Sequence, residues 1–217
     1  MLLKLVLRAR NLEPMDTSDP VVPKAIRSEI LKRGFLPLAI EHTRKSLDTA
    51  QQLLDAGFPS AAFVWATRSA EIFMREALLF PLWYEETGDV HASFAEVRDF
   101  LGSGRWSRSI RRVRETYGLI GEEDDALTDS GEDAFVAWTR DFVRPRGEIV
   151  HGRAEADEAM AVTAIAFAER MREWFTVRIV SSEVGPFAGV LREVFEHARA
   201  IYEAEQAQAD ESADSEG

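Results

Sequence analysis

Apolar positions along this chain recur with the spacing of amphipathic helices. A first helical pattern begins near Lys24 and is interrupted at Gly34 and Pro37. It then resumes and stops at residues 57–59, Gly-Phe-Pro. Because Gly and Pro are disfavoured inside helices, the pattern predicts a short helix, a break, and a longer helix with one apolar face.

The next stretch, from Ala61 to Phe80, is apolar around most of its circumference. A helix with this pattern is usually buried on all sides, so we expect it to be the central helix of the fold. Ser60, just before it, has the side chain of an N-cap residue and is predicted to begin the helix. Glu71 lies three positions after Arg68 and four before Arg75, the spacing of a local ion-pair ladder.

Further periodic stretches complete the chain. A short helix is predicted around residues 94–101, another at 131–143, and a long one within 154–180. The last stretch, 187–202, has a nearly heptad-like apolar stripe that is wide enough to dock on the bundle or on a second copy of the chain. Together these stretches predict an all-α protein.

The two ends of the chain depart from this pattern. Residues 1–35 are predicted to form an irregular arm and a short helix, and residues 206–217 a disordered acidic tail. The formal net charge is −12, and residues 203–217 carry six acidic and no basic side chains. An acidic balance argues against a generic nucleic-acid-binding surface, although half of the excess lies in this terminal segment.

Composition limits the other classes of protein. The absence of cysteine excludes disulfides and thiolate metal sites and fits a reducing compartment. No apolar run is long enough to span a bilayer, and the apolar start of the chain is too short for a secretory signal. We therefore expect a soluble cytoplasmic protein without membrane association. No His pair or carboxylate set has metal-ligand spacing, so neither a metal nor another cofactor is expected.

The stretch from Arg144 to Gly152 contains residues suited to chemistry on a phosphate. The guanidinium of Arg146 can bind phosphoryl oxygens as a fixed fork, and the imidazole of His151 can transfer protons near neutral pH. The spacing by itself is not diagnostic, because Arg192 precedes His197 by the same interval. That second pair lies in the amphipathic stretch 187–202, where both side chains are expected to face solvent.

Local backbone features distinguish the first pair. On a straight helix Arg146 and His151 would lie about 140° apart. Pro145 disfavours helix at Arg144 and suits a first helical turn, and a kink or helix start there would let the arginine reach the imidazole. The alternative is structural: Arg146 caps or salt-bridges a neighbouring helix, and His151 is half-buried. Glu71 either belongs to its local ladder or orients this pair.

A concentrated basic patch lies in the middle of the chain. Arg105, Arg108 and Arg112 are predicted to share one helical face, opposite an apolar one. Such a patch can follow a phosphate backbone. The acidic run within residues 122–133 follows at once and can neutralise the patch inside the protein. The sequence leaves both interpretations open.

Two segments together resemble the HEPN superfamily of small helical bundles. The first is a helical hairpin formed by residues 47–57 and 61–75, and the second is residues 146–152, Arg-Gly-Glu-Ile-Val-His-Gly, which lead into the long helix. The resemblance covers roughly residues 36–180 and implies a four-helix bundle core. The N-terminal arm, the basic mid-chain insertion and a C-terminal amphipathic helix at 186–205 lie outside it.

The resemblance implies a metal-independent endoribonuclease. In this family an Arg and a His from each of two protomers converge on one site at the dimer interface, which gives Arg146 and His151 as catalytic residues here. Supporting candidates are Arg144, Glu71 and Glu148, and RNA-binding candidates are Arg105, Arg108 and Arg112. The implied partners are RNA, a second copy of the chain and, for a toxin or phage-defence effector, an antitoxin or defence-system protein.

The chain departs from the family pattern at two positions. Active members usually have a polar residue directly after the Arg, where this chain has Gly147. Toxin members controlled by nucleotidyl transfer often have a Tyr two positions after the His, where this chain has Arg153. Gly147 and the acidic balance favour a rival hypothesis, a non-catalytic HEPN-like module that binds a nucleotide or RNA or acts as a scaffold. A third hypothesis is a helical interaction protein that uses the stripe at 187–202.

Overall fold

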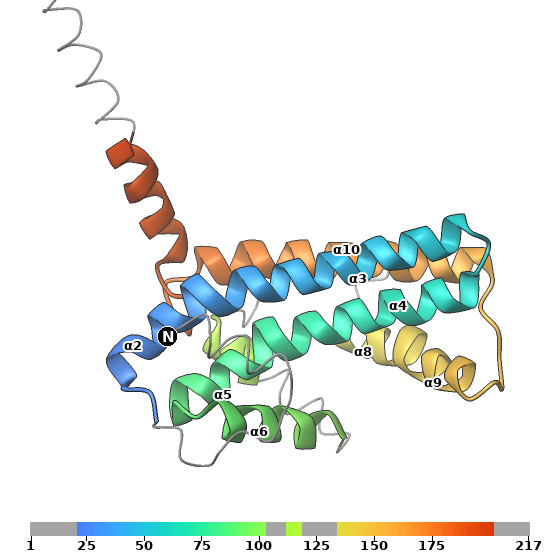
Figure 1. Ribbon diagram of the computed structural model, residues 1–217, viewed down its shortest axis with the longest axis horizontal. Helices are drawn as coiled ribbons and strands as arrows, with labels where there is room; N and C mark the ends of the chain where they lie inside the picture. The colour runs from blue at the N-terminus through green and yellow to red at the C-terminus, as the bar shows by residue number, and fades with distance from the viewer. Residues whose placement is uncertain (1–20, 103–111, 119–133, 202–217) are drawn as a thin grey trace, which may run out of the picture.

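The computed structural model describes residues 21–102, 112–118 and 134–201 (Figure 1). All regular structure in these ranges is helical, as the sequence pattern predicts. The first range contains α2 (Lys24–Ile30), η1 (Leu31–Phe35), α3 (Leu36–Asp55), α4 (Pro59–Phe73), η2 (Met74–Leu79), α5 (Phe80–Thr87) and α6 (Val90–Gly102). The last range contains α8 (Ala134–Trp138), η3 (Thr139–Val143), α9 (Arg144–Val150), α10 (Glu158–Ser181) and a helix over residues 190–201, called the C-terminal helix below.

Three π-helical turns, the elements marked η, let longer helices continue through proline. In each turn the residue before the proline donates its N–H to the carbonyl five positions back, namely Leu36 to Leu31, Phe80 to Arg75, and Arg144 to Thr139. A proline has no N–H to donate and its ring clashes with the preceding turn of a regular α-helix, and the wider turn relieves that clash. The break expected at Gly34 and Pro37 is therefore wrong, as is the expectation that Pro145 disfavours helix at Arg144.

The run α4–η2 lies at the centre of the helical bundle. Helices α3 and α10 pack along it, and the run from α8 to α9 packs on a further side (Figure 1). Phe142 of η3 stacks on Phe63 of α4 and on Phe167 of α10, with ring centroids 6.2 and 4.6 Å apart. Burying each such ring stabilises the fold by roughly 2–3 kcal/mol. The predicted central position of this helix is confirmed, but one side of it, which carries Arg68, is exposed.

Ser60 does not cap α4 as predicted. The helix begins at Pro59, which suits the first helical position because its missing N–H would have no partner there. Phe58 is the N-cap residue, and its side chain has no acceptor for a cap hydrogen bond. The Oγ of Ser60 instead accepts from the N–H of Ala156 at 2.9 Å and donates to the carbonyl of the same residue at 3.3 Å. Ser60 thereby fastens the linker of residues 151–157, which joins α9 to α10.

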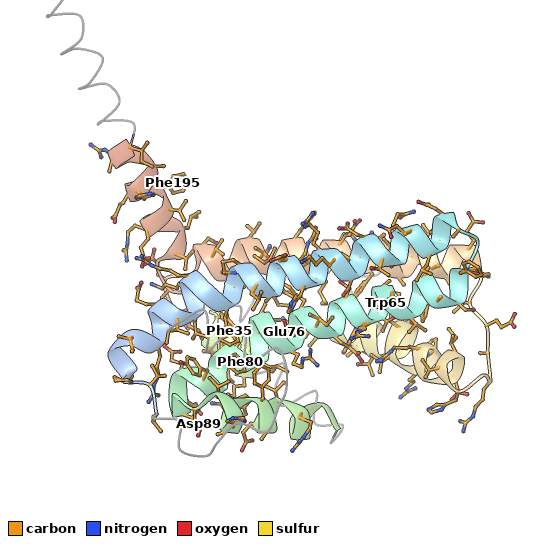
Figure 2. The ribbon with its side chains drawn as sticks, in the orientation of Figure 1. Phe35, Trp65, Glu76, Phe80, Asp89 and Phe195 are labelled. Carbon is orange, nitrogen blue, oxygen red and sulfur yellow. The ribbon has the colours of Figure 1, made fainter. Side chains whose placement is uncertain are left out.

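The C-terminal helix projects from the bundle (Figure 1). Its lead-in is anchored, because Phe187 is buried and stacks on Tyr117 with ring centroids 6.1 Å apart. From Leu191 to Ile201 every residue is exposed. Phe195, 65% exposed, lies on the projecting helix, away from the bundle (Figure 2). The stripe therefore docks on its own bundle only at its start, through Phe187 and Val190, and is exposed from Leu191 to Ile201.

Several predicted features lie outside the described residues. They are the arm before residue 21, the basic residues Arg105 and Arg108, the acidic run that follows them up to residue 133, and the tail after residue 201. Among the helices that are described, none is both long and apolar enough to cross a membrane.

Candidate functional site

Arg146 of α9 is held by a carboxylate of α4. Its Nη1 donates to Oε1 of Glu71 at 2.5 Å, and the two side chains are 30% and 26% exposed. The Nε of the same guanidinium is buried without a hydrogen-bond partner. Arg146 thus salt-bridges a neighbouring helix, as the structural alternative predicts, and Glu71 is the residue that orients it.

Glu71 is surrounded by positive charge. Burial raises the pKa of Glu71 above its ordinary value, and the guanidinium groups of Arg146, Arg75 and Arg68 act against that rise. Arg75 and Arg68 do not form the ion pairs with Glu71 that their spacing suggests, because each contacts another side chain. Arg75 donates to Glu76 at 2.9 Å, and the guanidinium of Arg68 lies 4.9 Å from the ring centroid of Trp65.

His151 ends α9 and faces solvent. It is the C-cap residue, with φ −89° and ψ 7°, and its N–H donates to the carbonyl of Gly147 at 3.2 Å. Gly152 then turns the chain with a φ of 67°, which glycine adopts without strain. Because His151 is exposed, the interpretation of this residue as a half-buried histidine is wrong. The half-buried histidine is His42, whose Nδ1 lies 2.9 Å from Oε2 of Glu76.

Arg146 and His151 are not joined to each other within one chain by a hydrogen bond or an ion pair. The kink expected to bring them together does not form, because α9 is a regular helix from Arg144 to Val150. Five residues of regular helix leave two side chains about 140° apart. The backbone of α9 therefore does not by itself bring the two groups together.

The remaining supporting candidates lie on the surface of α9. Arg144 is exposed, and Glu148 is exposed and pairs with Arg153 at 3.6 Å. Gly147 lies inside the helix, and a Cβ added there would meet no atom within 4 Å. The position that departs from the family pattern therefore has room for a side chain.

Of the three predicted RNA-binding arginines, Arg112 is within the described residues. Its guanidinium lies 4.1 Å from the ring centroid of Trp83, and it also pairs with Glu86. Arg112 is thus paired with Glu86 of α5, whereas the acidic run that was expected to neutralise the patch lies outside the described residues.

A surface hollow of about 400 Å³ follows His151. It is lined by Ser60, Ile149, Gly152, Arg153, Ala154 and Glu155. Arg153 and Glu155 give its wall one side chain of each charge. Ser60 was not among the predicted site residues, because its hydrogen bonds to Ala156 join positions far apart in the sequence.

No group of three or more His, Asp or Glu side chains in the described ranges is arranged to hold a metal ion. Comparisons of this chain with models of protein families, with curated proteins and with solved structures find no match.

Proposed function

We propose that this protein is a metal-independent endoribonuclease of the HEPN type, acting as a toxin or phage-defence effector. The observation that carries the proposal is that one helix holds a fixed guanidinium and, near its end, an exposed imidazole. Arg146 is oriented by Glu71, while His151, five residues further along, is exposed at the end of the same helix. In the other pair with this spacing, Arg192 is paired with Glu183 at 3.4 Å, but both of those side chains are more than half exposed, and His197 is exposed as well.

RNA supplies its own nucleophile, so these two groups are sufficient for the chemistry. An imidazole of His151 accepts the proton of the ribose 2′-hydroxyl, and the resulting oxygen attacks the adjacent phosphorus. The bond from phosphorus to the 5′-oxygen breaks, and a protonated His151 of the second copy donates a proton to that oxygen. The products are a 2′,3′-cyclic phosphate and a 5′-hydroxyl end.

Arg146 stabilises the charge that develops on the phosphoryl oxygens during this step. A guanidinium has five N–H donors, and the hydrogen bond to Glu71 uses one, from Nη1. A cation that is already fixed needs little reorganisation when the substrate binds, and such preorganised groups are among the largest contributions to catalysis. The second copy brings the two arginines and the two histidines to one cleft.

The decisive experiment incubates labelled RNA with wild type and with His151→Ala in EDTA. We expect wild type to cleave and the variant to lose activity by at least about 100-fold, the usual contribution of a general acid or base. His197→Ala is the matched control, because it removes another exposed histidine five residues after an arginine. Equal cleavage by wild type and His151→Ala, or none by wild type, would remove the catalytic claim.

The cellular role has a separate test. A toxin or defence effector that cleaves RNA arrests growth when it is expressed without a neutralising partner. We expect wild type to arrest growth and His151→Ala to be tolerated at the same expression level, with His197→Ala as toxic as wild type. Arrest by all three proteins would show that toxicity does not depend on this site.

A second candidate function is favoured by the projecting C-terminal helix. Its exposed apolar residues, among them Val194 and Phe195, are typical of a surface that binds another protein. In that case the chain is a helical interaction protein that binds a partner through this stripe. Cleavage that disappears with His151→Ala excludes this alternative as the sole function.

A further inference from the structure

The solvent side of α4 carries cationic and aromatic residues next to the Arg146–Glu71 pair. Trp65, Arg68, Glu71 and Arg75 follow one another at intervals of three or four residues, which places them on neighbouring turns of one helix side. The label in Figure 2 shows Trp65 on α4. The electrostatic effect of Arg68 on Glu71 places both charges in the same neighbourhood.

Arg68 differs from its neighbours because it forms no salt bridge with a described carboxylate. Arg75 pairs with Glu76 and Arg146 pairs with Glu71. Arg68 is exposed and makes no salt bridge to any described residue. Its contact is with the ring of Trp65, at 4.9 Å from the centroid. A cation–π contact of this kind restricts the side chain while leaving its N–H donors available.

The direction of the two helices places Arg68 on the His151 side of the site. Glu71 contacts Arg146. Ser60, which precedes Glu71 in α4, contacts Ala156, which follows Arg146. The two segments therefore run in opposite directions. Going from Glu71 to Arg68 moves about 4.5 Å along α4, and going from Arg146 to His151 moves about 7.5 Å along α9 in the same direction.

We propose that Arg68, supported by Trp65, binds a backbone phosphate of single-stranded RNA next to the phosphate that is cleaved. The proposal rests on the proposed ribonuclease function and adds a substrate-positioning residue to it. An unpaired guanidinium on an otherwise acidic protein, held on an aromatic ring, is suited to a strand whose phosphates are accessible. Trp65 restricts the orientations of the guanidinium before RNA binds. Binding therefore costs less side-chain conformational entropy.

The test measures binding without cleavage. The probe is a fluorescent single-stranded oligoribonucleotide with 2′-O-methyl groups, which has no free 2′-hydroxyl nucleophile. Fluorescence anisotropy at several salt concentrations gives both the Kd and its dependence on salt. We expect Arg68→Ala to weaken binding about 5- to 10-fold, the effect of one exposed charge-assisted contact, and to lower the slope of log K against log salt by about 0.7.

Two further variants separate the roles. Trp65→Leu keeps the charge and removes the ring, so it should weaken binding less than Arg68→Ala and leave the salt slope unchanged. Arg44→Ala is the matched control, because Arg44 is an exposed arginine of α3; it should bind within about twofold of wild type. Circular dichroism and melting curves establish that each variant is folded.

The outcomes for the two proposals are distinct. If wild type cleaves RNA but Arg68→Ala binds the probe as Arg44→Ala does, the role of Arg68 is overturned and the ribonuclease stands. If wild type does not cleave but binds the probe in an Arg68-dependent way, the ribonuclease fails and the phosphate contact stands. If wild type does not bind the probe at all, the role of Arg68 is also overturned.

Discussion

The hydroxyl of Tyr117 donates to the backbone carbonyl of Ala77, at 3.3 Å, and to that of Leu78, at 3.1 Å. In a regular α-helix the carbonyl of Ala77 would accept from the N–H four residues later, but that residue is Pro81, which has none. Tyr117 therefore supplies a donor where the proline of η2–α5 removes one. Burial raises the pKa of Tyr117 well above its ordinary value, so the hydroxyl keeps its proton at neutral and mildly alkaline pH.

We predict that Tyr117→Phe lowers the free energy of unfolding by about 1–3 kcal/mol, because it leaves buried carbonyls without this donor. Tyr84 is a matched control, since its ring is equally buried and its hydroxyl has no hydrogen-bond partner. Tyr84→Phe should change stability by less than about 0.5 kcal/mol or increase it. Urea denaturation of both variants measures the difference, and equal losses would contradict the role assigned to the Tyr117 hydroxyl.

The pKa of Glu71 gives a pH-dependent prediction. Because burial raises this pKa in the folded state, the folded protein holds the proton more tightly than the unfolded chain does. The contribution of Glu71 to stability is therefore present below its unfolded pKa and is lost as the pH rises through the folded value. We expect Glu71→Gln, which has no carboxylate to ionise, to gain stability relative to wild type as the pH rises from about 4.5.

Denaturation midpoints between pH 4 and pH 8 test this expectation. Glu71→Ala is the informative comparison, because it removes the acceptor as well as the charge and leaves the partly buried Arg146 unpaired. It should be less stable than Glu71→Gln by about 1–3 kcal/mol at every pH. A constant difference between wild type and Glu71→Gln across the range, or a difference that falls with pH, would show that the pKa is not raised.

Gly147 and Gly88 are predicted to respond in opposite ways to substitution by alanine. It lies inside α9, and a Cβ there meets nothing within 4 Å, so Gly147→Ala should stabilise the protein by about 0.5–1 kcal/mol. Gly88 has a φ of +66°, and a Cβ there would lie 2.4 Å from Nε of Arg27. Gly88→Ala should therefore destabilise the protein. Thermal melts of the two variants should shift in opposite directions.

The same position tests the proposed chemistry. Active members of the resembled family usually have a polar residue after the arginine, and Gly147→Asn restores one in the open space beside Arg146. An added hydrogen bond to substrate of about 1–1.5 kcal/mol would raise the cleavage rate up to about tenfold. The measurement is the rate of RNA cleavage in EDTA, with Gly147→Ala as the control for helix stability. A rate for Gly147→Asn below that of Gly147→Ala would contradict the expected role of this position.

The helices were predictable because periodicity reports burial directly. The apolar circumference of Ala61 to Phe80 corresponds to α4 and η2, and the run within 154–180 corresponds to α10. The prolines were misinterpreted as breaks for a physical reason. The helix passes Pro37 through a π-turn that contains the backbone hydrogen bond from Leu36 to Leu31. A backbone hydrogen bond of this kind cannot be predicted from the pattern of apolar and polar side chains.

The candidate site was predictable in its residue types and not in its contacts. Spacing along one helix shows which side chains share a face, so it suggested Arg68 and Arg75 as the partners of Glu71. The actual partner, Arg146, is 75 residues away and meets Glu71 because α9 packs on α4. The kink that was expected to bring Arg146 to His151 does not form, because α9 is a regular helix from Arg144 to Val150. In the ribonuclease proposal the two groups converge across two copies of the chain, an arrangement that spacing along one chain does not describe.

The exposed stripe of the C-terminal helix provides the last prediction. If the dimer is built around His151, the stripe is not needed for self-association. Phe195→Glu places a charge at a side chain that is 65% exposed, so it should change stability by less than about 0.5 kcal/mol and leave the mass of the protein in light scattering unchanged. Ala200→Glu, on the same exposed helix, adds the same negative charge and controls for the change in net charge. A monomer produced by Phe195→Glu alone would place the self-association surface on the projecting helix, away from His151, and would favour the interaction protein over the ribonuclease.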